Sequence, residues 1–420
     1  MKRKIKINVF KILIYIFTLL LVLTTNSVYN NLVDYNFHLP FIFVFIEFLI
    51  IFYQIMKGNF DRKKFKNIIV FIFMYIVIVS ITMFISKPFD LTNFISRFII
   101  IFPLSLIMFY CLKNKKEFIT LLCDAFINIM FFISVTSLLL YIFGPILGIL
   151  EPSGYIGVHW GGAKLIKSYY NIYFNRQTFY SRYFSIARNS SIFNEAPMYA
   201  LNLTIAFALL NLKEKQHKFK YLLFIISILS TLSTISIVIS SVIIFVKFLK
   251  SKNKNQLLNL LKILFIPLLA GSLFFISSSF INIRKNTSSY DARLDDYRAS
   301  FKTFKENPFF GVGYQNETEI IENMQYDRKD KNGDYNIGIS NSFGLLLAEC
   351  GLILFVFQLI GCINLFIKSL KNKNYINIYF YVVIISLYFT MIFAYTPLLF
   401  VLLAYTFSPF LEEKNNYEKN

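Results

Sequence analysis

Five ionisable side chains lie inside apolar runs of this chain, where a charge is costly to bury. They are Glu47, Arg97, Asp124, Glu195 and Glu349. Ionisable groups inside a lipid bilayer are rare and commonly mark a substrate or ion site. By rise per residue, four of the five fall in the half of the bilayer that we assign below to the outer side, and only Asp124 falls on the inner side. Pairing with a neighbouring helix is the alternative role for each of them.

A second group of candidates is cationic and lies between two apolar runs. The segment from Glu151 to Ser190 carries five cations against one acid; the cations are Lys164, Lys167, Arg176, Arg182 and Arg188. Arginine binds phosphate oxygens with a two-pronged fork, and arginines can neutralise the charge that develops on a departing diphosphate. This segment therefore predicts binding of an anionic lipid head group. General anchoring to anionic lipid is the alternative.

The same residues argue against a metal centre. The first predicted outer loop contains only Asp34 as an acid, so it lacks the acidic pair that a metal-dependent lipid-linked sugar transferase would use. Histidine occurs three times, and the four cysteines lie in or beside apolar runs without a C-x-x-C spacing. These patterns predict neither a zinc site nor a disulfide framework. Arginine is thus favoured for neutralising the diphosphate.

A third charged segment, RLDDYRASFKTFKENPFFGVGYQN, runs from Arg293 to Asn316. Its apolar residues recur at i, i+3, i+7 and i+10 and so share one helical face; they are Leu294, Tyr297, Phe301 and Phe304. Pro308 should end the helix, and Gly311 and Gly313 should turn the chain. We expect an amphipathic helix that lies on the outer membrane surface.

The elements that position these residues are membrane helices. The 420 residues are 56% hydrophobic and only 16% charged, with a mean hydropathy of +0.57. A soluble globular chain carries about 25% charged residues, so most of this chain must face lipid. The amino-terminal apolar run is too long for a signal peptide and has no clear cleavage site, so it is read as a first span that is kept.

Apolar runs of about 20 residues predict eight single spans. They are Val9–Val28, Leu39–Met56, Asn67–Ile85, Asn93–Leu112, Phe118–Phe143, Glu195–Leu212, Leu257–Ser279 and Asn341–Ile367. Two further runs, Tyr221–Leu249 and Tyr375–Phe410, are each interpreted as a hairpin of two short helices, because the first contains STLST and the second is broken at Pro397. The total is about twelve spans; a different count at either hairpin is the alternative.

The distribution of Lys and Arg predicts the orientation. The predicted inner segments hold 27 of the 43 cations, whereas the short outer loops hold only Lys87. Cytoplasmic loops carry such an excess, so both termini are predicted to be cytoplasmic and the net charge of +20 does not indicate nucleic-acid binding. The fold class is thus an all-α polytopic membrane protein, one integral domain over residues 1–420. It has a basic extracytoplasmic loop at 151–194 and a larger one at 280–340, before the tenth helix.

Three segments resemble those of Wzy-type O-antigen and capsular polysaccharide polymerases, in the O-antigen polymerase/ligase superfamily. RNSSIFNEAPMYALNL, Arg188–Leu203, is similar to their Arg-x-x-s-x-F-x-E-x-P segment. The Arg293–Asn316 segment resembles their arginine-rich segment that ends in N-P-x-x-G-x-G. SNSFGLLLAECGLILFVFQLI, Ser340–Ile360, resembles the helix read as H/S-N-S…E-x-G-x-x-G. The ordered motifs cover about 80 residues, and the many-span pattern extends the similarity along the whole chain.

The resemblance implies a GT-C-like membrane glycosyltransferase without a metal, cofactor or nucleotide-sugar. Such enzymes join undecaprenyl-diphosphate-linked oligosaccharide units on the outer face of the bacterial cytoplasmic membrane. A flippase and a chain-length regulator are the expected partners besides membrane lipid. Related ligases transfer the glycan to a lipid A core and typically have His where this chain has Ser340. A ligase is therefore the alternative, and a lipid-linked oligosaccharide flippase a further one, although no repeat between two halves is visible.

On this interpretation each candidate residue has a role. Arg188 and Arg293 bind the donor diphosphate and stabilise it as it leaves, with Arg97 and Arg298 as second candidates. Glu195 is the first choice for the general base that takes the proton of the acceptor hydroxyl. Weaker choices are Asp295 and Asp296, which could instead form i, i+3 surface pairs with arginines, and His159. Asn341 is a candidate sugar ligand.

Overall fold

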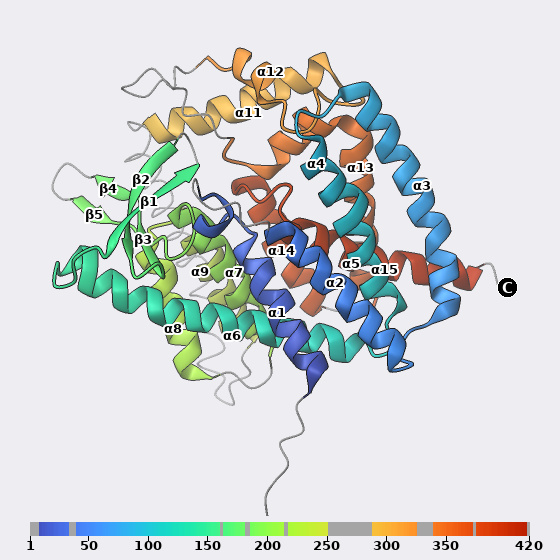
Figure 1. Ribbon diagram of the computed structural model, residues 1–420, viewed down its shortest axis with the longest axis horizontal. Helices are drawn as coiled ribbons and strands as arrows, with labels where there is room; N and C mark the ends of the chain where they lie inside the picture. Colours follow the sequence, from blue (N-terminus) through green and yellow to red (C-terminus); the bar gives the residue numbers. More distant parts are fainter. Residues whose placement is uncertain are drawn as a thin grey trace, which may run out of the picture.

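The computed structural model describes residues 8–32, 39–159, 163–180, 185–213, 217–250, 288–325, 339–372 and 375–417. The predicted span Leu257–Ser279 falls outside these residues. Helices make up most of the described chain (Figure 1).

The amino-terminal helices follow the predicted spans closely. They are α1 (Val9–Leu23), α2 (Leu39–Met56), α3 (Arg62–Ser86), α4 (Leu91–Phe94), α5 (Phe102–Cys111) and α6 (Lys115–Tyr141), with π-helical segments at Ile95–Ile101 and Ile142–Ile146. The first helix is shorter than predicted. The Thr24 and Thr25 hydroxyls donate back to the Leu20 and Leu21 carbonyls, and Asn26 takes a left-handed conformation with φ 56°, which ends the helix.

In the carboxy-terminal half, two successive helices occupy each run that was predicted as a hairpin. Its helices are α7 (Ala196–Asn211), α8 (Lys218–Ser230), α9 (Thr234–Lys250), α11 (Ser288–Glu306), α12 (Glu317–Glu322), α13 (Ser342–Lys371), α14 (Tyr375–Thr390) and α15 (Pro397–Tyr417). The break between α8 and α9 contains Leu232 with φ 50°, and the break before α15 ends at Pro397. Helix breaks therefore occur where the sequence predicts them.

Five of the described helices are long and apolar enough to cross a bilayer. They are Leu39–Met56, Arg62–Ser86, Leu91–Cys111, Lys115–Ile146 and Ser342–Lys371, and shorter apolar helices accompany them. Large apolar side chains on their outer faces are exposed, as on α3, where Phe73 is 67% exposed. Such surfaces are stable against lipid and not against water. The chain is thus a mostly helical, polytopic membrane protein.

The all-α expectation needs one correction, because the basic loop contains strands. Within the described residues, β1 (Gly154–His159), β2 (Ala163–Tyr169) and β3 (Tyr173–Asn175) form one antiparallel sheet, and β4 (Thr178–Tyr180) pairs with β5 (Ser185–Ala187). Val158, Ile166 and Phe174 are buried in a small core of their own with Val28. Backbone pairing and this core give the loop a fixed shape.

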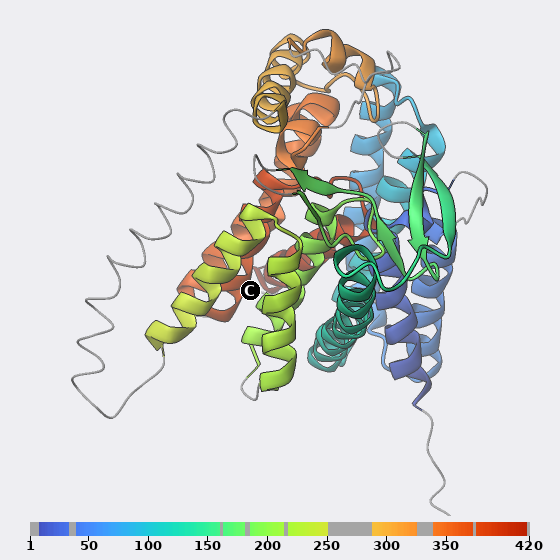
Figure 2. The same ribbon diagram turned by 90° about the vertical axis from the view of Figure 1, so that its left-hand side faces the viewer.

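The loops gather at opposite ends of the helices. At one end of α2, bridges join Ser27 to Phe193 and Leu32 to Val158; at its other end a bridge joins Phe60 to Leu112. The strands, α11 and α12 all lie at the first end (Figure 2). Both long loops that carry the sequence candidates are therefore on the same side of the helices.

Helix α11 forms as predicted, and it turns a polar face toward the protein. Its buried residues are mainly polar and include Asp295 and Asp296, which are 5% and 1% exposed. Leu294 and Phe301 are 54% and 42% exposed. The two aspartates do not lie at the surface, because both are buried and accept backbone hydrogen bonds inside the protein.

Candidate functional site

The segment from Arg188 to Glu195 is a rigid buried loop between β5 and α7. The six residues between these two are buried, while Arg188 and Glu195 are each partly exposed. Asn189 Oδ1 accepts from the Ser137 hydroxyl at 2.6 Å and from the Ser191 backbone at 3.1 Å. Asn194 Nδ2 donates to the Ser27 carbonyl at 3.1 Å. The middle of the motif is thus scaffold, and its two charged ends are the groups that can meet a substrate.

Glu195 is the N-cap residue of α7, yet its side chain does not cap the helix. Instead, Gln177 from the turn between β3 and β4 does so, because its Oε1 accepts the Ala196 N–H at 3.1 Å. Because Gln177 caps the helix, the Glu195 carboxylate is not used as the cap and stays beside the positive N-terminal end of α7. The Gln177 carbonyl also accepts the Arg188 N–H at 2.8 Å, so one residue ties both ends of the motif together.

Arg176, adjacent to Gln177, is close enough to Glu195 for the two charges to interact. Burial lowers the pKa of the Arg176 guanidinium from its usual value, and the negative charge of Glu195 opposes that shift. Arg188 Nε donates to the Thr231 carbonyl at 2.9 Å, in the turn between α8 and α9. The structure therefore places two arginines and a carboxylate around the start of α7. The sequence analysis counted Arg176 only as a loop cation.

The other candidates from the basic loop and α11 lie in different settings. His159 is exposed at the end of β1, and its backbone N–H donates to the Asn31 carbonyl at 2.8 Å. Arg293 is partly buried on α11, close enough to Tyr297 for its charge to act on that phenol. Arg298 is exposed and donates to the Gln325 side chain. His159 and Arg298 thus show no contact with the Glu195 cluster among the described residues.

Asp295 and Asn341 make hydrogen bonds that hold the backbone. Both Asp295 carboxylate oxygens accept from the Gln325 N–H, at 3.0 and 3.2 Å, and Asp296 accepts the Ser340 N–H at 2.9 Å. Asn341 is the N-cap of α13, with its Oδ1 accepting the Gly344 N–H at 2.6 Å. Its Nδ2 is buried and has no partner among the described residues. These contacts are structural, and the Asn341 amide retains donors that could bind another group.

Arg97 belongs to a second polar cluster, inside the helices. Its guanidinium donates to the Tyr314 hydroxyl and lies 5.8 Å from the centre of that ring. Glu349 Oε2 accepts the Gln315 N–H at 3.0 Å, and the Tyr395 hydroxyl lies within hydrogen-bonding reach of the same carboxylate. Burial raises the pKa of the Tyr314 hydroxyl above its usual range, against the lowering effect of Arg97. This arrangement pairs Arg97 internally and favours its alternative role as a group that holds helices together.

Helix α13 is interrupted at Gly351, whose φ of 63° and ψ of −173° are not helical. The Ala348 and Glu349 carbonyls accept from the Val312 and Gly313 N–H groups, both at 3.0 Å. On the other side of the break, the Leu352 and Ile353 N–H groups donate to the Pro308 and Phe309 carbonyls, at 2.8 and 3.2 Å. The N-P-x-x-G-x-G segment therefore supplies hydrogen-bond partners for the four backbone groups of α13 that flank the break.

The two remaining ionisable residues also have partners. Glu47 is fully buried and accepts from the Ser105 hydroxyl at 2.5 Å, and Asp124 forms a salt bridge with Lys213. Within the residues that the structure describes, no three His, Cys, Asp or Glu side chains gather in a way that could hold a metal ion.

Comparison with known families matches residues 219–359 to the family model described as O-antigen ligase. The match covers about a third of the chain. It includes α11, the N-P-x-x-G-x-G segment and the break of α13, whereas the Arg188–Leu203 segment precedes it. No curated protein matches the chain. This match is consistent with the resemblance to the O-antigen polymerase/ligase superfamily.

Proposed function

We propose, on the premise of that superfamily match, that this chain is a metal-independent polymerase of undecaprenyl-diphosphate-linked oligosaccharide units. It acts on the outer face of the bacterial cytoplasmic membrane, with both termini in the cytoplasm and a GT-C-like arrangement of helices. The product is an O-antigen, capsule or exopolysaccharide. A flippase that supplies the units and a chain-length regulator are its partners in this proposal.

The observation that carries the proposal is the cluster at the start of α7. Glu195 is close enough to Arg176 for the two charges to interact, Arg188 lies at the other end of the same loop, and Gln177 holds both ends. A carboxylate and arginines side by side are what the transfer of a sugar from a diphosphate requires. The cluster lies at the end of the helices where the strands and α11 also lie, which is the end with few cations in its short loops.

The proposed reaction uses these groups as follows. The Glu195 carboxylate accepts the proton of a sugar hydroxyl on the incoming lipid-linked unit. The hydroxyl oxygen then bonds to the anomeric carbon of the growing chain, and the bond from that carbon to the diphosphate breaks. The electron pair of the broken bond goes to the diphosphate oxygen, whose charge Arg188 and Arg293 stabilise. Arg176 positions Glu195 and is not itself a proton acceptor, because guanidinium stays protonated.

Ser340 favours a polymerase over a ligase. Its hydroxyl stands where ligases typically carry His, and a serine hydroxyl cannot serve as a general base near neutral pH as imidazole can. The Ser340 N–H is held by Asp296, which fixes this position against α11. Ligation to a lipid A core is the second candidate function, supported by the description of the matching family. A flippase is less well supported, because it needs no carboxylate at a diphosphate site.

The test is complementation of a strain that lacks this protein, with surface glycan resolved on a gel. Glu195→Gln should reduce polymerisation by about 10²–10⁴-fold, and Arg188→Ala and Arg293→Ala should also remove the ladder while single units remain attached. Lys116→Gln, which changes an exposed cation outside this loop, is the control and should leave the ladder intact. Membrane levels of each variant must match the wild type.

Two other outcomes contradict polymerisation, and a third contradicts only the catalytic role of Glu195. A normal ladder on the lipid carrier that never reaches its final acceptor would identify a ligase. Absence of all surface glycan, with lipid-linked units trapped inside the cell, would identify a flippase. A normal ladder in Glu195→Gln would remove Glu195 from the chemistry.

A further inference from the structure

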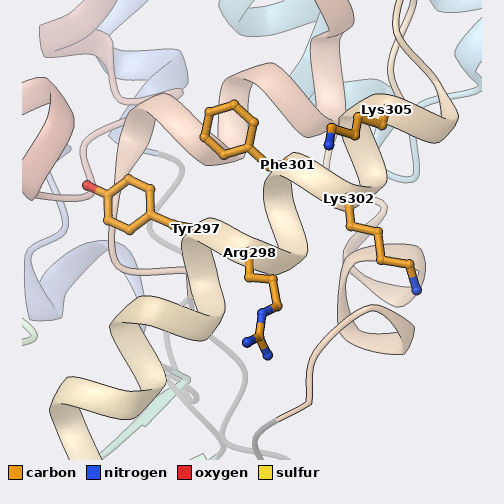
Figure 3. A pocket seen from close by; sticks show the side chains of 5 residues that line it. All are labelled: Tyr297, Arg298, Phe301, Lys302 and Lys305. Atoms are coloured by element: carbon orange, nitrogen blue, oxygen red, sulfur yellow. The ribbon is translucent and has the colours of Figure 1, made fainter.

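The outward face of α11 carries a groove that the proposed reaction does not use. It has a volume of about 320 Å³ and is lined by Tyr297, Arg298, Phe301, Lys302 and Lys305 (Figure 3). Three cations and two aromatic rings thus meet on one helix, at the end of the molecule where the strands also lie.

The apolar part of this face is exposed for a structural reason. The protein side of α11 is occupied by Asp295, Asp296 and other small or polar residues that hold the neighbouring backbone. Leu294 and Phe301 are consequently turned outward. An exposed apolar strip beside cations is the pattern of a helix that lies in a membrane interface.

Contacts with α14 set how deep in the membrane the exposed apolar strip of α11 lies. The Tyr297 hydroxyl donates to the Phe389 carbonyl, at the end of α14. The Phe301 ring lies 6.2 Å from that of Phe343, which stacks on Phe389 at 4.4 Å. Phe389, Ile385 and Val382 form an exposed apolar row along α14. Because α14 is an apolar helix whose exposed row faces lipid, the aromatic side of α11 lies where that lipid-facing row ends.

Two of the three cations lie on the other side of the helix from the aromatic rings (Figure 3). Arg298 and Lys302 point away from Tyr297 and Phe301, and Lys305 lies one turn from Phe301 (Figure 3). A molecule in this groove would therefore place an apolar part against Phe301 and an anionic part against Lys302 and Lys305. Arg298 gives one N–H to Gln325 and keeps others for the same anion.

We propose that this groove binds the phosphate head group of an anionic phospholipid of the surrounding leaflet. Lys302, Lys305 and Arg298 contact the phosphate, while Phe301 and Tyr297 pack on the glycerol and the first acyl carbons. This assignment moves Arg298 from the donor site to a lipid site. The position of the groove at the end of a lipid-facing row favours a bilayer lipid over a soluble acidic glycan.

The test uses the full-length protein in bilayers and tryptophan fluorescence. The chain has one tryptophan, Trp160, so Trp160→Phe gives a silent background in which Phe301→Trp reports on the groove. The bilayers contain equal minor fractions of acyl-brominated phosphatidylglycerol or acyl-brominated phosphatidylcholine, since bromine quenches tryptophan on contact. Phe73→Trp, on the lipid-facing side of α3 and within an apolar run, is the matched control.

We expect the brominated anionic lipid to quench the Phe301→Trp variant at least about twice as strongly as the zwitterionic lipid does. Adding Lys302→Gln and Lys305→Gln to this variant should remove that difference and leave quenching by phosphatidylcholine unchanged. The Phe73→Trp variant should be quenched equally by both lipids.

Two results would overturn the proposal. Equal quenching of the Phe301→Trp variant by both lipids, before and after the lysine substitutions, would exclude head-group binding in the groove. An unquenched Phe301→Trp variant, beside a quenched Phe73→Trp variant, would place α11 away from the bilayer.

These outcomes are independent of the proposed polymerase. The bilayers contain no glycan and no lipid diphosphate, so preferential quenching cannot come from a reaction substrate. Conversely, loss of the polysaccharide ladder in a Glu195 variant would not alter the quenching of an indole placed at position 301.

Discussion

Replacement of Gly351 by alanine should destabilise the protein strongly, because this residue sits at the break of α13. Its φ of 63° with ψ of −173° is a region that almost only glycine occupies. A Cβ at this position would lie 2.6 Å from the Phe309 carbonyl oxygen and closer still to the Gly311 nitrogen. Neither is the end of a flexible side chain, so the backbone itself would have to move.

The magnitude follows from two contributions. The backbone conformation alone costs an alanine about 1–3 kcal/mol. Displacing the 308–313 segment weakens up to four hydrogen bonds between it and α13, each worth about 1 kcal/mol net. If half of them are lost, the total is roughly 3–5 kcal/mol, which is a large share of the stability of a protein.

Thermal unfolding in detergent, followed by the loss of the monodisperse size-exclusion peak, measures this effect. Gly58→Ala is the matched control, because Gly58 has φ +69° but a Cβ there would meet nothing within 4 Å. Gly58→Ala therefore measures the cost of placing an alanine in a left-handed backbone without the steric clash, about 1 kcal/mol. We expect Gly351→Ala to lower the unfolding temperature at least twice as much as Gly58→Ala.

An equal effect of the two alanines would refute the close backbone crossing at Gly351. A rise in the unfolding temperature would refute more, because it would mean that α13 prefers to be a continuous helix. Gly311→Ala offers an independent check from the other segment, since its Cβ would clash with the Glu349 backbone.

Three further predictions concern individual hydrogen bonds and one ion pair. Gln177→Ala removes the cap of α7 and should cost about 1 kcal/mol in thermal unfolding and reduce the glycan ladder, whereas Gln177→Glu keeps the acceptor oxygen and should retain both. Asp296→Ala leaves the partly buried Ser340 N–H without its acceptor and should cost about 1–3 kcal/mol, while Asp296→Asn should cost less; an equal loss in both would show that the charge matters more than the bond. A double-mutant cycle of Asp124→Asn and Lys213→Gln should give a coupling below about 1 kcal/mol, because both side chains are 36% exposed; a larger value would mean that the pair is shielded from solvent.

The helices were predictable because lipid imposes one pattern on them. Runs of apolar residues gave most of the spans, and STLST and Pro397 located the breaks within the two hairpins. The strands were missed although a signal exists. Tyr155–Val158 and Leu165–Tyr169 flank a Gly-Gly pair, which is a hairpin pattern, but strands of three to seven residues are weak beside spans of twenty.

The site was predictable only in part. Charge inside an apolar run identified Glu195 and Glu349, but sequence spacing cannot show that Arg176, 19 residues away, is close enough for its charge to interact with Glu195. Asp295 and Asp296 were expected at the surface because charged residues usually lie there. Their burial depends on the backbone of Gln325 and Ser340, and such long-range contacts leave no periodic signal in the sequence.

The interrupted helix has a consequence for the order in which this protein matures in the membrane. Residues 342–371 form an apolar stretch that inserts most readily as one unbroken helix, because lipid offers no partner for free backbone groups. The break at Gly351 needs the 308–313 segment. That segment is synthesised before α13 and is separated from it in the chain by the intervening loop. We therefore expect insertion to come first and the break to form later, when that segment docks. Until then the carboxylate of Glu349 lacks its Gln315 partner.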